Sequence, residues 1–413
     1  MIIIQGMNKN YKPRWIAELM RNSLENACVM VLTGARQVGK TTLLWNEPPF
    51  SDWNYYDLDD FDTFEMAKRV PSELLAPENV VIDEVQRVPE LLNHIRSLVD
   101  REPNRRIVLS GSANLALMRN VAQSLAGRAI YFVLRTMTAG EMQGVPYQPI
   151  LKNLLENADI GRINCRKPKS SLEFMLWRGF LPPLMSFSQI DHIVRWWESY
   201  IMTYLERDLR TLSAVASLVD FRNVMKRLAL STGSLLNETE IARDTGVSQS
   251  TVHRYVNLLE TSHVAVRLRG FYRSKSKRLI KRPKVYFMDT GLLAFLMDLY
   301  DPQAVKRNDS IGKLMETYVF NALMTHIEML TPKGTIHYWR EVGGREVDFV
   351  VEWRGQILTI EVKASKSVSF KDFDNITRLM EKSDNVACGV VIYGGDEIVQ
   401  FGKSFIALPW YCL

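Results

Sequence analysis

The feature that most limits how this chain can fold is a glycine-rich turn placed between an apolar run and a helix start. Residues 28–32 (Cys-Val-Met-Val-Leu) are apolar and predict a buried strand of a parallel sheet. The turn after them matches the phosphate-binding pattern Gly34-x-x-x-x-Gly39-Lys40-Thr41. Because strand, loop and helix stand in the order that this pattern requires, we interpret it as a phosphate-binding loop and not as a chance match.

Each residue type in this loop has a chemical reason. The two glycines allow a tight turn whose backbone N–H groups can face a triphosphate. Lys40 reaches the β- and γ-phosphates, and the Thr41 hydroxyl can ligate Mg²⁺. The helix that begins here directs the positive end of its dipole toward the phosphates. The predicted nucleotide-binding residues of the loop are Gly34, Ala35, Arg36, Gln37, Val38, Gly39, Lys40, Thr41 and Thr42.

A second short apolar strand, residues 79–82, ends in Asp83 and Glu84. This is the Walker B form that P-loop ATPases need, with Asp83 holding Mg²⁺ directly or through water and Glu84 polarising the attacking water. A structural strand end with two acids is the alternative, but its position after a phosphate-binding loop favours catalysis. We therefore predict ATP and Mg²⁺ as cofactors, Glu84 and Lys40 as catalytic residues, and Thr41 and Asp83 as metal ligands.

Two further segments could complete this site. Residues 106–110 predict a buried strand, and Ser110 or Ser112 at its C-terminal end could sense the γ-phosphate. A plain strand-to-loop serine pair explains them equally well. Of the two, we predict Ser112 as a nucleotide-binding residue. Arg128 follows Gly127 and could act as an arginine finger on a neighbouring subunit's nucleotide, which makes it a catalytic candidate. A structural surface arginine is the competing interpretation.

The middle of the chain contains a proline-rich connector and an amphipathic segment. Residues 136–190 carry several prolines and predict a connector with a small helical lid. Residues 191–212 have apolar side chains at helical spacing, with Asp191 as the expected N-cap. Trp196 and Trp197 could stack on nucleic acid, but an aromatic stripe at this period more often belongs to a core.

A helix-turn-helix is predicted next. A short helix at 239–244 meets Gly246, and Ser248 then caps a longer helix. Behind it, residues 267–284 contain no acid and predict a basic hairpin wing whose phosphate contacts would be salt-sensitive. Packing between domains, or docking of a protein, is the alternative use of such a winged helix. The predicted DNA-contacting residues are Gln249, Ser250, Thr251, Arg254, Arg273, Lys275, Lys277 and Arg278.

The last segment predicts a β-hairpin that concentrates carboxylates. The two-residue turn Arg354-Gly355 implies a register with Asp348 opposite Glu361 and Glu346 opposite Lys363. The other face of the hairpin is apolar and suited to a core. Like charges on opposed residues repel, and a divalent cation between them would remove that cost. Oxygen ligands of this kind suit Mg²⁺ or Mn²⁺.

Residues 34–41, 81–86 (Val-Ile-Asp-Glu-Val-Gln), 109–112 and 124–128 (Ser-Leu-Ala-Gly-Arg) together resemble the AAA-type ATPases of archaea and bacteria that carry a C-terminal domain of unassigned function. The resemblance covers nearly the whole chain. It implies an additional-strand, catalytic-glutamate ATPase with Glu84 as that glutamate. Such proteins are often placed near the signal-transduction ATPases and DNA-processing motors.

The C-terminal hairpin in turn resembles the restriction-endonuclease-type core, and Glu361-Val-Lys363 is similar to the version found in archaeal Holliday-junction resolvases. This resemblance implies that Asp348 and Glu361 ligate metal, that Lys363 assists, and that Glu316 from a preceding helix completes the site. Val347 stands where the leading proline of that motif is usual. Both an active metal site and a structural, ion-paired hairpin in an inactive nuclease fold remain open.

Composition adds only broad limits. The chain has 413 residues and a net charge of +6, which favours a polyanionic partner weakly. Four separated cysteines (Cys28, Cys165, Cys388 and Cys412) lack metal-ligand spacing and lead us to expect reduced thiols in the cytoplasm. We predict an α/β protein with an AAA-type P-loop parallel-sheet core (1–150), a connector and helical lid (151–215), a winged helix (216–285) and a restriction-endonuclease-like domain (286–413).

These patterns predict an ATP-hydrolysing, DNA-binding enzyme: a motor for remodelling or branch migration, or an ATP-regulated nuclease. The alternative is a nucleotide-gated signal-transduction switch whose winged helix docks a protein and whose nuclease-like domain is inactive. A host-defence or mobile-element effector is a third, smaller possibility. The expected partners are duplex or branched DNA and further copies of the chain in a homo-oligomer such as a hexamer, without a membrane.

Overall fold

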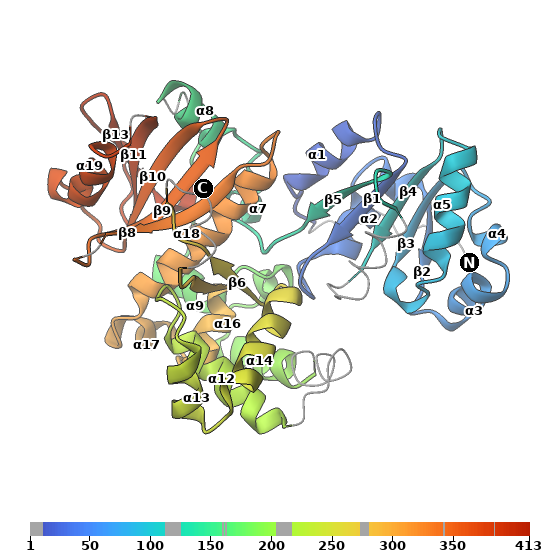
Figure 1. Ribbon diagram of the computed structural model, residues 1–413, viewed down its shortest axis with the longest axis horizontal. Helices are drawn as coiled ribbons and strands as arrows, with labels where there is room; N and C mark the ends of the chain where they lie inside the picture. The colour runs from blue at the N-terminus through green and yellow to red at the C-terminus, as the bar shows by residue number, and fades with distance from the viewer. Residues whose placement is uncertain are drawn as a thin grey trace. The chain divides into compact units, whose positions relative to one another are not determined.

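The computed structural model describes residues 11–111, 125–158, 161, 163–203, 217–272, 281–341, 343–383 and 385–413. The chain divides into two compact units (Figure 1). The first unit holds residues 1–135 with 261–263, and the second holds residues 136–260 with 264–413.

The first unit is built on a five-stranded sheet in the order β2-β3-β4-β1-β5. All of its neighbouring strands run parallel. Its strands are β1 (Val29–Thr33), β2 (Asn54–Asp57), β3 (Asn79–Asp83), β4 (Arg106–Ser110) and β5 (Ala129–Val133). Its helices are α1 (Ile16–Ser23), α2 (Lys40–Asn46), η1 (Phe50–Asp52), α3 (Phe61–Arg69), α4 (Pro71–Leu74), η2 (Val85–Arg87) and α5 (Leu91–Arg101).

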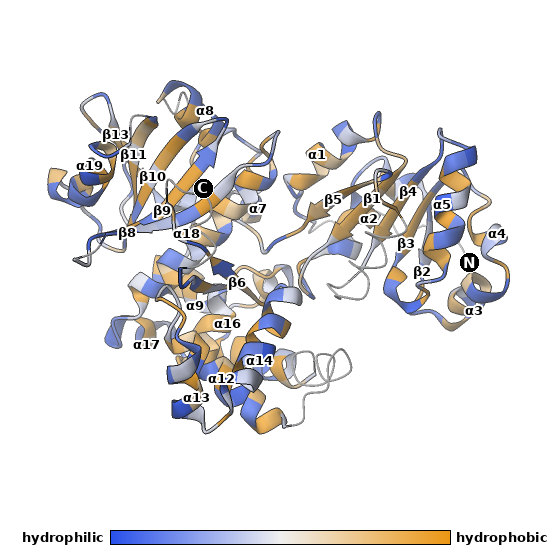
Figure 2. Cartoon of the chain, viewed as in Figure 1, coloured by the Kyte–Doolittle hydropathy of each residue, from blue (hydrophilic) through white to orange (hydrophobic). Residues whose placement is uncertain are grey.

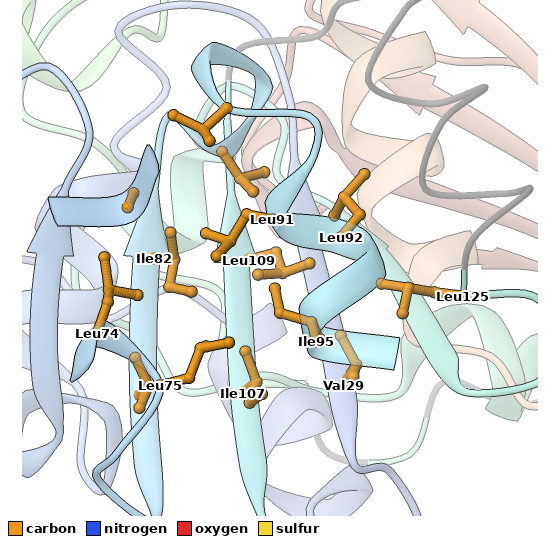
Figure 3. Packing of buried hydrophobic residues seen from close by; sticks show 14 of the residues in the cluster. Val29, Leu74, Leu75, Ile82, Leu91, Leu92, Ile95, Ile107, Leu109 and Leu125 are labelled. Atoms are coloured by element: carbon orange, nitrogen blue, oxygen red, sulfur yellow. The ribbon is translucent and has the colours of Figure 1, made fainter. Parts of the chain in front are cut away.

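The core of this unit explains the apolar strands. Every residue of β1 is buried, as expected for a central strand of a parallel sheet covered on both faces. Figure 2 shows the hydropathy of its residues. Ile82 and Leu109 from neighbouring strands face Leu92 and Ile95 of α5 (Figure 3). Burial of each such side chain contributes about 1.5–3 kcal/mol. This packing fixes the strand ends on which the polar residues of the unit stand.

The second unit begins with helices. They are α7 (Ala139–Met142), α8 (Ile150–Asn157), α9 (Leu172–Arg178), η3 (Pro182–Ser186), α10 (Ile190–Tyr200), α12 (Leu218–Leu230), α13 (Glu238–Thr245), α14 (Gln249–Thr261), α16 (Thr290–Leu296), α17 (Pro302–Arg307) and α18 (Ile311–Glu328). Strands β6 (Ala265–Leu268) and β7 (Lys284–Phe287) form an antiparallel pair directly after α14. The remaining elements are β8 (Thr335–Arg340), β9 (Glu346–Trp353), β10 (Gln356–Lys363), η5 (Phe370–Phe373), α19 (Asp374–Met380), β11 (Val386–Tyr393), β12 (Val399–Phe401), β13 (Phe405–Pro409) and η6 (Trp410–Cys412).

The predicted pair of helices around Gly246 is confirmed. Asn237 caps α13 by accepting a hydrogen bond from the Glu240 N–H at 3.3 Å. Gly246 has φ +71°, a left-handed conformation that glycine adopts without strain, and α14 follows. Ser248 accepts a hydrogen bond from the Thr251 N–H at 3.2 Å, which is the cap that the sequence predicts.

A mixed sheet of six strands forms the end of the chain, in the order β12-β13-β11-β10-β9-β8. Strands β9 and β10 pair antiparallel with Gln356 opposite Trp353 and Ile360 opposite Phe349, so the register predicted from the two-residue turn is confirmed. The expectation of only one covered face is wrong. Phe349 contacts Phe320 of α18, whereas its neighbour Val350 packs in a cluster with α19. Helices therefore cover both faces of this sheet.

Two local expectations are corrected. Helix α10 begins at Ile190 and its N-cap is Gln189, so Asp191 lies inside the first turn and is not the cap. The helix begins earlier than predicted, because the apolar spacing alone does not mark where a helix begins. Trp197 is buried, in agreement with the core interpretation, and Trp196 stacks on Tyr200.

The cysteines give the second correction. Cys165 and Cys412 form a disulfide with their Cα atoms 4.9 Å apart, although 247 residues separate them. The expectation of four reduced thiols is therefore wrong for this pair, because folding brings together two cysteines that no sequence spacing connects. Cys28 and Cys388 are free thiols. Across the described ranges, no helix combines the length and apolar character needed to cross a bilayer.

Candidate functional site

The backbone of residues 34–41 turns as a phosphate-binding loop must. Gly34 has φ +153°, and a Cβ at this position would lie 2.2 Å from the Leu134 carbonyl oxygen. Gln37 and Gly39 have φ of +66° and +95°, both in the left-handed region. Glycine is therefore required at Gly34 by a backbone contact as well as by conformation.

Lys40, at the start of α2, is buried inside this turn, with 7% of its surface exposed. Its Nζ donates hydrogen bonds to the carbonyl oxygens of Gly34 and Ala35 at 3.1 and 3.0 Å. Burial lowers the pKa of Lys40, and the nearby carboxylates of Glu84 and Asp83 oppose that shift. The loop thus holds the ammonium group beside two acids, the arrangement that the motif predicts.

Asp83 is the most heavily hydrogen-bonded group of the site. The Thr41 hydroxyl donates to its Oδ2 at 2.6 Å, and the Tyr55 hydroxyl donates to the same oxygen at 2.5 Å. Its Oδ1 accepts from the Ser110 hydroxyl and from the Glu84 N–H, the latter at 2.9 Å. These donors come from α2, β2, β4 and the residue that follows β3. They hold a carboxylate that is only 2% exposed in one orientation.

Sequence reasoning missed Tyr55. Tyr55 stands on β2 opposite Val81 of β3, and Asp57 of β2 stands opposite Asp83. Because side chains alternate along a strand, Tyr55 lies on the same face of β2 as Asp57, the strand neighbour of Asp83. No local signal in the sequence shows that β2 and β3 are neighbours, so this contact required the tertiary structure.

Glu84 begins the turn after β3 with φ +52°, a left-handed conformation that is uncommon for a non-glycine residue. Such backbone strain costs of the order of 1–3 kcal/mol and clusters at active sites. Gln86 donates a hydrogen bond from its Nε2 to the Glu84 carboxylate. Burial and the charge of Asp83 raise the pKa of Glu84, while Lys40 lowers it. A carboxylate with a raised pKa beside a P-loop has the chemistry of a general base.

Ser112 and Arg128 are the remaining residues predicted for this site. Ser112 lies outside the described residues, whereas Ser110 contacts Asp83 and belongs to the hydrogen-bond network just described. Arg128 forms a two-pronged ion pair with Asp100, at 2.5 and 3.1 Å, at the start of the edge strand β5. Its role as a finger remains a prediction.

Comparison with known proteins places the chain among ATPases. Residues 26–143 match the family "AAA domain", residues 169–303 match a domain of unknown function (DUF8612), and residues 311–413 match another (DUF4143). The uncharacterized proteins Mb2031c of Mycobacterium bovis and Rv2008c of Mycobacterium tuberculosis are each 30% identical over 406 residues, covering 95% of this chain and 82% of theirs. The chain belongs to the same family as these mycobacterial proteins. Its AAA domain makes it an AAA-type P-loop ATPase.

Among solved structures, the Walker-type ATPase paby2304 of Pyrococcus abyssi matches this ATPase with a TM-score of 0.40 at 16% identity, over 68% of this chain and 94% of that one. The Holliday junction branch migration motor RuvB of Thermotoga maritima matches with a TM-score of 0.29 at 16% identity, over 60% and 89% of the two chains. At such scores these likenesses carry no inference about activity.

Four of the eight predicted DNA-contacting residues stand on α14. Gln249, Ser250 and Arg254 are exposed, and Thr251 is half-buried beside its cap. The neighbouring His253 lies 3.1 Å from Glu238 of α13. The other four predicted contacts, Arg273, Lys275, Lys277 and Arg278, lie outside the described residues.

The carboxylates predicted in the C-terminal domain are close enough to affect one another. Burial raises the pKa of Asp348 well above its ordinary value, and the charges of Glu316 and Glu361 raise it further. Asp348 accepts a hydrogen bond from the Val362 N–H at 2.8 Å, and Lys363 donates to Glu361 at 3.0 Å. Sequence reasoning missed a further member, Lys284 of β7, which forms ion pairs with Glu316 and Glu346.

Proposed function

We propose that this ATPase hydrolyses ATP with Mg²⁺ and couples hydrolysis to movement or remodelling of DNA, such as branch migration. The observation that carries the proposal is the contact of Thr41 with Asp83, next to a buried Lys40 and a Glu84 whose pKa is raised. These residues combine a metal-binding pair, a phosphate-binding cation and a base in one small site. A helix-turn-helix in the same chain supplies a second element that suits a polyanion.

The residues fit a magnesium nucleotide. The Thr41 hydroxyl and the Asp83 carboxylate would hold Mg²⁺, since they are hard oxygen donors 2.6 Å apart. When bound, Mg²⁺ supplies charge neutralisation to the β- and γ-phosphates. Lys40 would exchange its bonds to Gly34 and Ala35 for phosphate oxygens. The Glu84 carboxylate would orient the attacking water and accept its proton.

The DNA-binding part of the proposal rests on the exposed residues of α14 and on charge. Gln249, Ser250 and Arg254 project from the first turns of the second helix, the part that enters a major groove in helix-turn-helix proteins. The segment 267–284 contains no acid, so its phosphate contacts would not depend on sequence and would weaken as salt increases. Measurement of ATPase rate without DNA, with linear duplex and with a four-way junction tests the proposal. Equal rates in all three conditions would refute it.

A second function is favoured by a different observation. Helix α13 places Glu238 3.1 Å from His253 on the exposed side of α14, and this acid reduces the attraction of this surface for phosphates. The ATPase would then be a nucleotide-gated switch whose helix-turn-helix docks a protein. A switch turns over slowly and is not stimulated by DNA. Fluorescence anisotropy with labelled duplex at several salt concentrations separates the two functions, because a switch would leave the duplex unbound even at low salt.

The proposal includes assembly into a homo-oligomer, in which Arg128 of one subunit would reach the nucleotide of the next. Its pairing with Asp100 supports this use, since a half-exposed ion pair at a sheet edge contributes about 0–1 kcal/mol and can be exchanged. Mixing Arg128→Ala with Glu84→Gln subunits tests it, because restored activity requires one subunit to act on another. We place the protein in the cytoplasm, where ATP and DNA meet. The Cys165–Cys412 disulfide weighs against that location, since cytosolic thiols are kept reduced.

A further inference from the structure

The carboxylate cluster of the C-terminal domain, formed by Glu316, Glu346, Asp348 and Glu361, includes a lysine side chain. Lys284 is the first residue of β7 and is only 2% exposed. Its Nζ lies 3.4 Å from Glu316 Oε1 on α18 and forms an ion pair with Glu346 on β9. The Tyr286 hydroxyl, from the same strand, donates to Glu316 Oε1 at 2.5 Å. One short strand thus binds the carboxylates of a helix and a sheet at once.

Three carboxylates of the cluster, Glu316, Glu346 and Glu361, have ion-pair partners within the protein, and Asp348 accepts a backbone hydrogen bond. Burial alone would lower the pKa of Lys284, but the carboxylates of Glu316, Glu346 and Asp348 raise it above its ordinary value. Lys363 donates to Glu361 at 3.0 Å, so the second half of the cluster also has its own ammonium partner. Arg340 lies 3.7 Å from Glu346 at the rim of the cluster. The ammonium of Lys284 therefore lies beside Glu316, one of the three carboxylates that the nuclease resemblance assigns to a metal, and the ammonium of Lys363 lies beside another, Glu361.

The residues do not fit a nuclease-type divalent cation. Mg²⁺ and Mn²⁺ need several oxygen ligands around one point. In the part of the chain that the structure describes, no group of three or more acidic, histidine or cysteine side chains is arranged to hold a metal. One feature favours a metal, because Glu361 Oε2 is buried without a hydrogen-bond partner. A single oxygen does not make a site, and of the neighbouring carboxylates Glu316 is already paired with Lys284.

We propose that Lys284 takes the place of a divalent cation in this cluster. The cluster is then a structural joint, a set of ion pairs that connects the helix-turn-helix segment to the C-terminal sheet. It is not a DNA-cleaving centre. Two hydrogen bonds support a joint at this place. The Tyr338 hydroxyl on β8 donates to the Arg282 carbonyl at 2.6 Å, and the Phe271 N–H donates to the Tyr338 carbonyl at 2.6 Å. Both ends of the described β6–β7 connection are thus bound to β8. The joint does not depend on the DNA binding proposed above.

The test measures Mn²⁺ binding by calorimetry in full-length protein carrying Asp83→Ala, which removes the metal position of the nucleotide site. We expect no stoichiometric Mn²⁺ binding in this background. Addition of Lys284→Ala removes the buried ammonium that pairs with the partly buried carboxylates of Glu316 and Glu346, so Tm should fall by several °C. It should also create Mn²⁺ binding near one ion per chain, and Mn²⁺ should recover part of the lost Tm. Lys281→Ala, an exposed basic residue on the same segment, is the matched control and should change neither quantity.

Two results would overturn the proposal. Stoichiometric Mn²⁺ binding in the Asp83→Ala protein, abolished by adding Asp348→Ala, would overturn the proposal, and so would plasmid cleavage lost on Asp348→Ala. If Lys284→Ala does not fold, the Asp83→Ala measurement still decides, and Glu346→Gln provides a milder variant that should lower Tm without creating a metal site. Because these readouts are metal binding and Tm, they are independent of any effect of DNA on the ATPase rate.

Discussion

Replacement of Asp289 by asparagine should destabilise this ATPase less at neutral pH than at acidic pH. Asp289 caps α16 and accepts hydrogen bonds from the N–H groups of Gly291 and Leu292 at 2.7 and 3.3 Å. It also accepts from the Phe180 N–H at 2.7 Å, and it is only 1% exposed. Burial raises the pKa of Asp289 to about 6, against the lowering effect of these three hydrogen bonds and of Arg178.

The magnitude follows from this pKa. A carboxyl group whose pKa rises on folding contributes stability that is complete below its unfolded pKa of 3.8 and is lost as pH rises through about 6. The full loss is about 3 kcal/mol, since each pKa unit corresponds to about 1.36 kcal/mol. Between pH 5 and pH 7.5 the linkage relation gives a loss of about 1.4 kcal/mol. Asparagine does not titrate, so Asp289→Asn should escape this loss.

The assay is urea unfolding followed by tryptophan fluorescence at pH 5 and pH 7.5. The difference in unfolding free energy between Asp289→Asn and the wild type should move by about 1.4 kcal/mol in favour of the variant at pH 7.5. Asp289→Ala is the control and should show the same pH effect. Its unfolding free energy should be roughly 3–6 kcal/mol lower than that of the wild type, because the substitution leaves three buried N–H groups without an acceptor. A difference that does not change with pH, or that changes in the opposite direction, would refute the reasoning.

Three further predictions concern the nucleotide site and acid stability. Glu84→Gln should lower kcat by about 10²–10⁴ while nucleotide affinity stays unchanged, and Lys40→Ala should remove nucleotide binding itself; single-turnover hydrolysis and equilibrium binding distinguish the two. Arg128→Ala should lower kcat by about 10³ or more without changing Tm beyond about 1 °C, whereas Asp100→Ala should leave kcat unchanged. Equal effects of the two variants on kcat would refute the role of Arg128 as an arginine finger. Burial lowers the pKa of His326 to about 4. The folded state therefore binds fewer protons than the unfolded chain between about pH 4 and 6.5, and stability falls by about 2 kcal/mol on acidification to pH 5. His326→Phe should abolish this acid loss in the same urea assay, and an unchanged pH dependence would contradict the assignment.

The parts of this molecule that the sequence predicts are those encoded by local spacing. The phosphate-binding loop, the acidic end of β3, the helices around Gly246 and the register of β9 with β10 each depend on residues within one short segment. Their geometry follows from glycine conformation, capping and turn length. A short pattern of residue types is therefore sufficient to place them.

The contacts that the sequence does not predict join residues across long separations. Tyr55 meets Asp83 only because β2 is the neighbour of β3, and Lys284 meets Glu316 only because β7 packs near α18. Cys165 reaches Cys412 through the packing of the second unit. In each case the partner is chosen by strand order or helix docking. These depend on the whole core and leave no mark in the local pattern.

The polar groups of the nucleotide site already have hydrogen-bond partners, some local and some distant in sequence. Lys40 is bonded to carbonyl oxygens of its own loop, Thr41 to Asp83, and Glu84 to Gln86. Nucleotide binding would therefore exchange existing hydrogen bonds for new ones, and its free energy would be a difference between them. Charged hydrogen bonds contribute about 1.5–3 kcal/mol net, so each exchange involves an energy comparable to a ten-fold to hundred-fold change in affinity. Because the donors to Asp83 come from α2, β2 and β4, a change at the γ-phosphate end would be transmitted first to these elements. Tyr55 and Ser110 are then the groups through which the central sheet would detect the nucleotide.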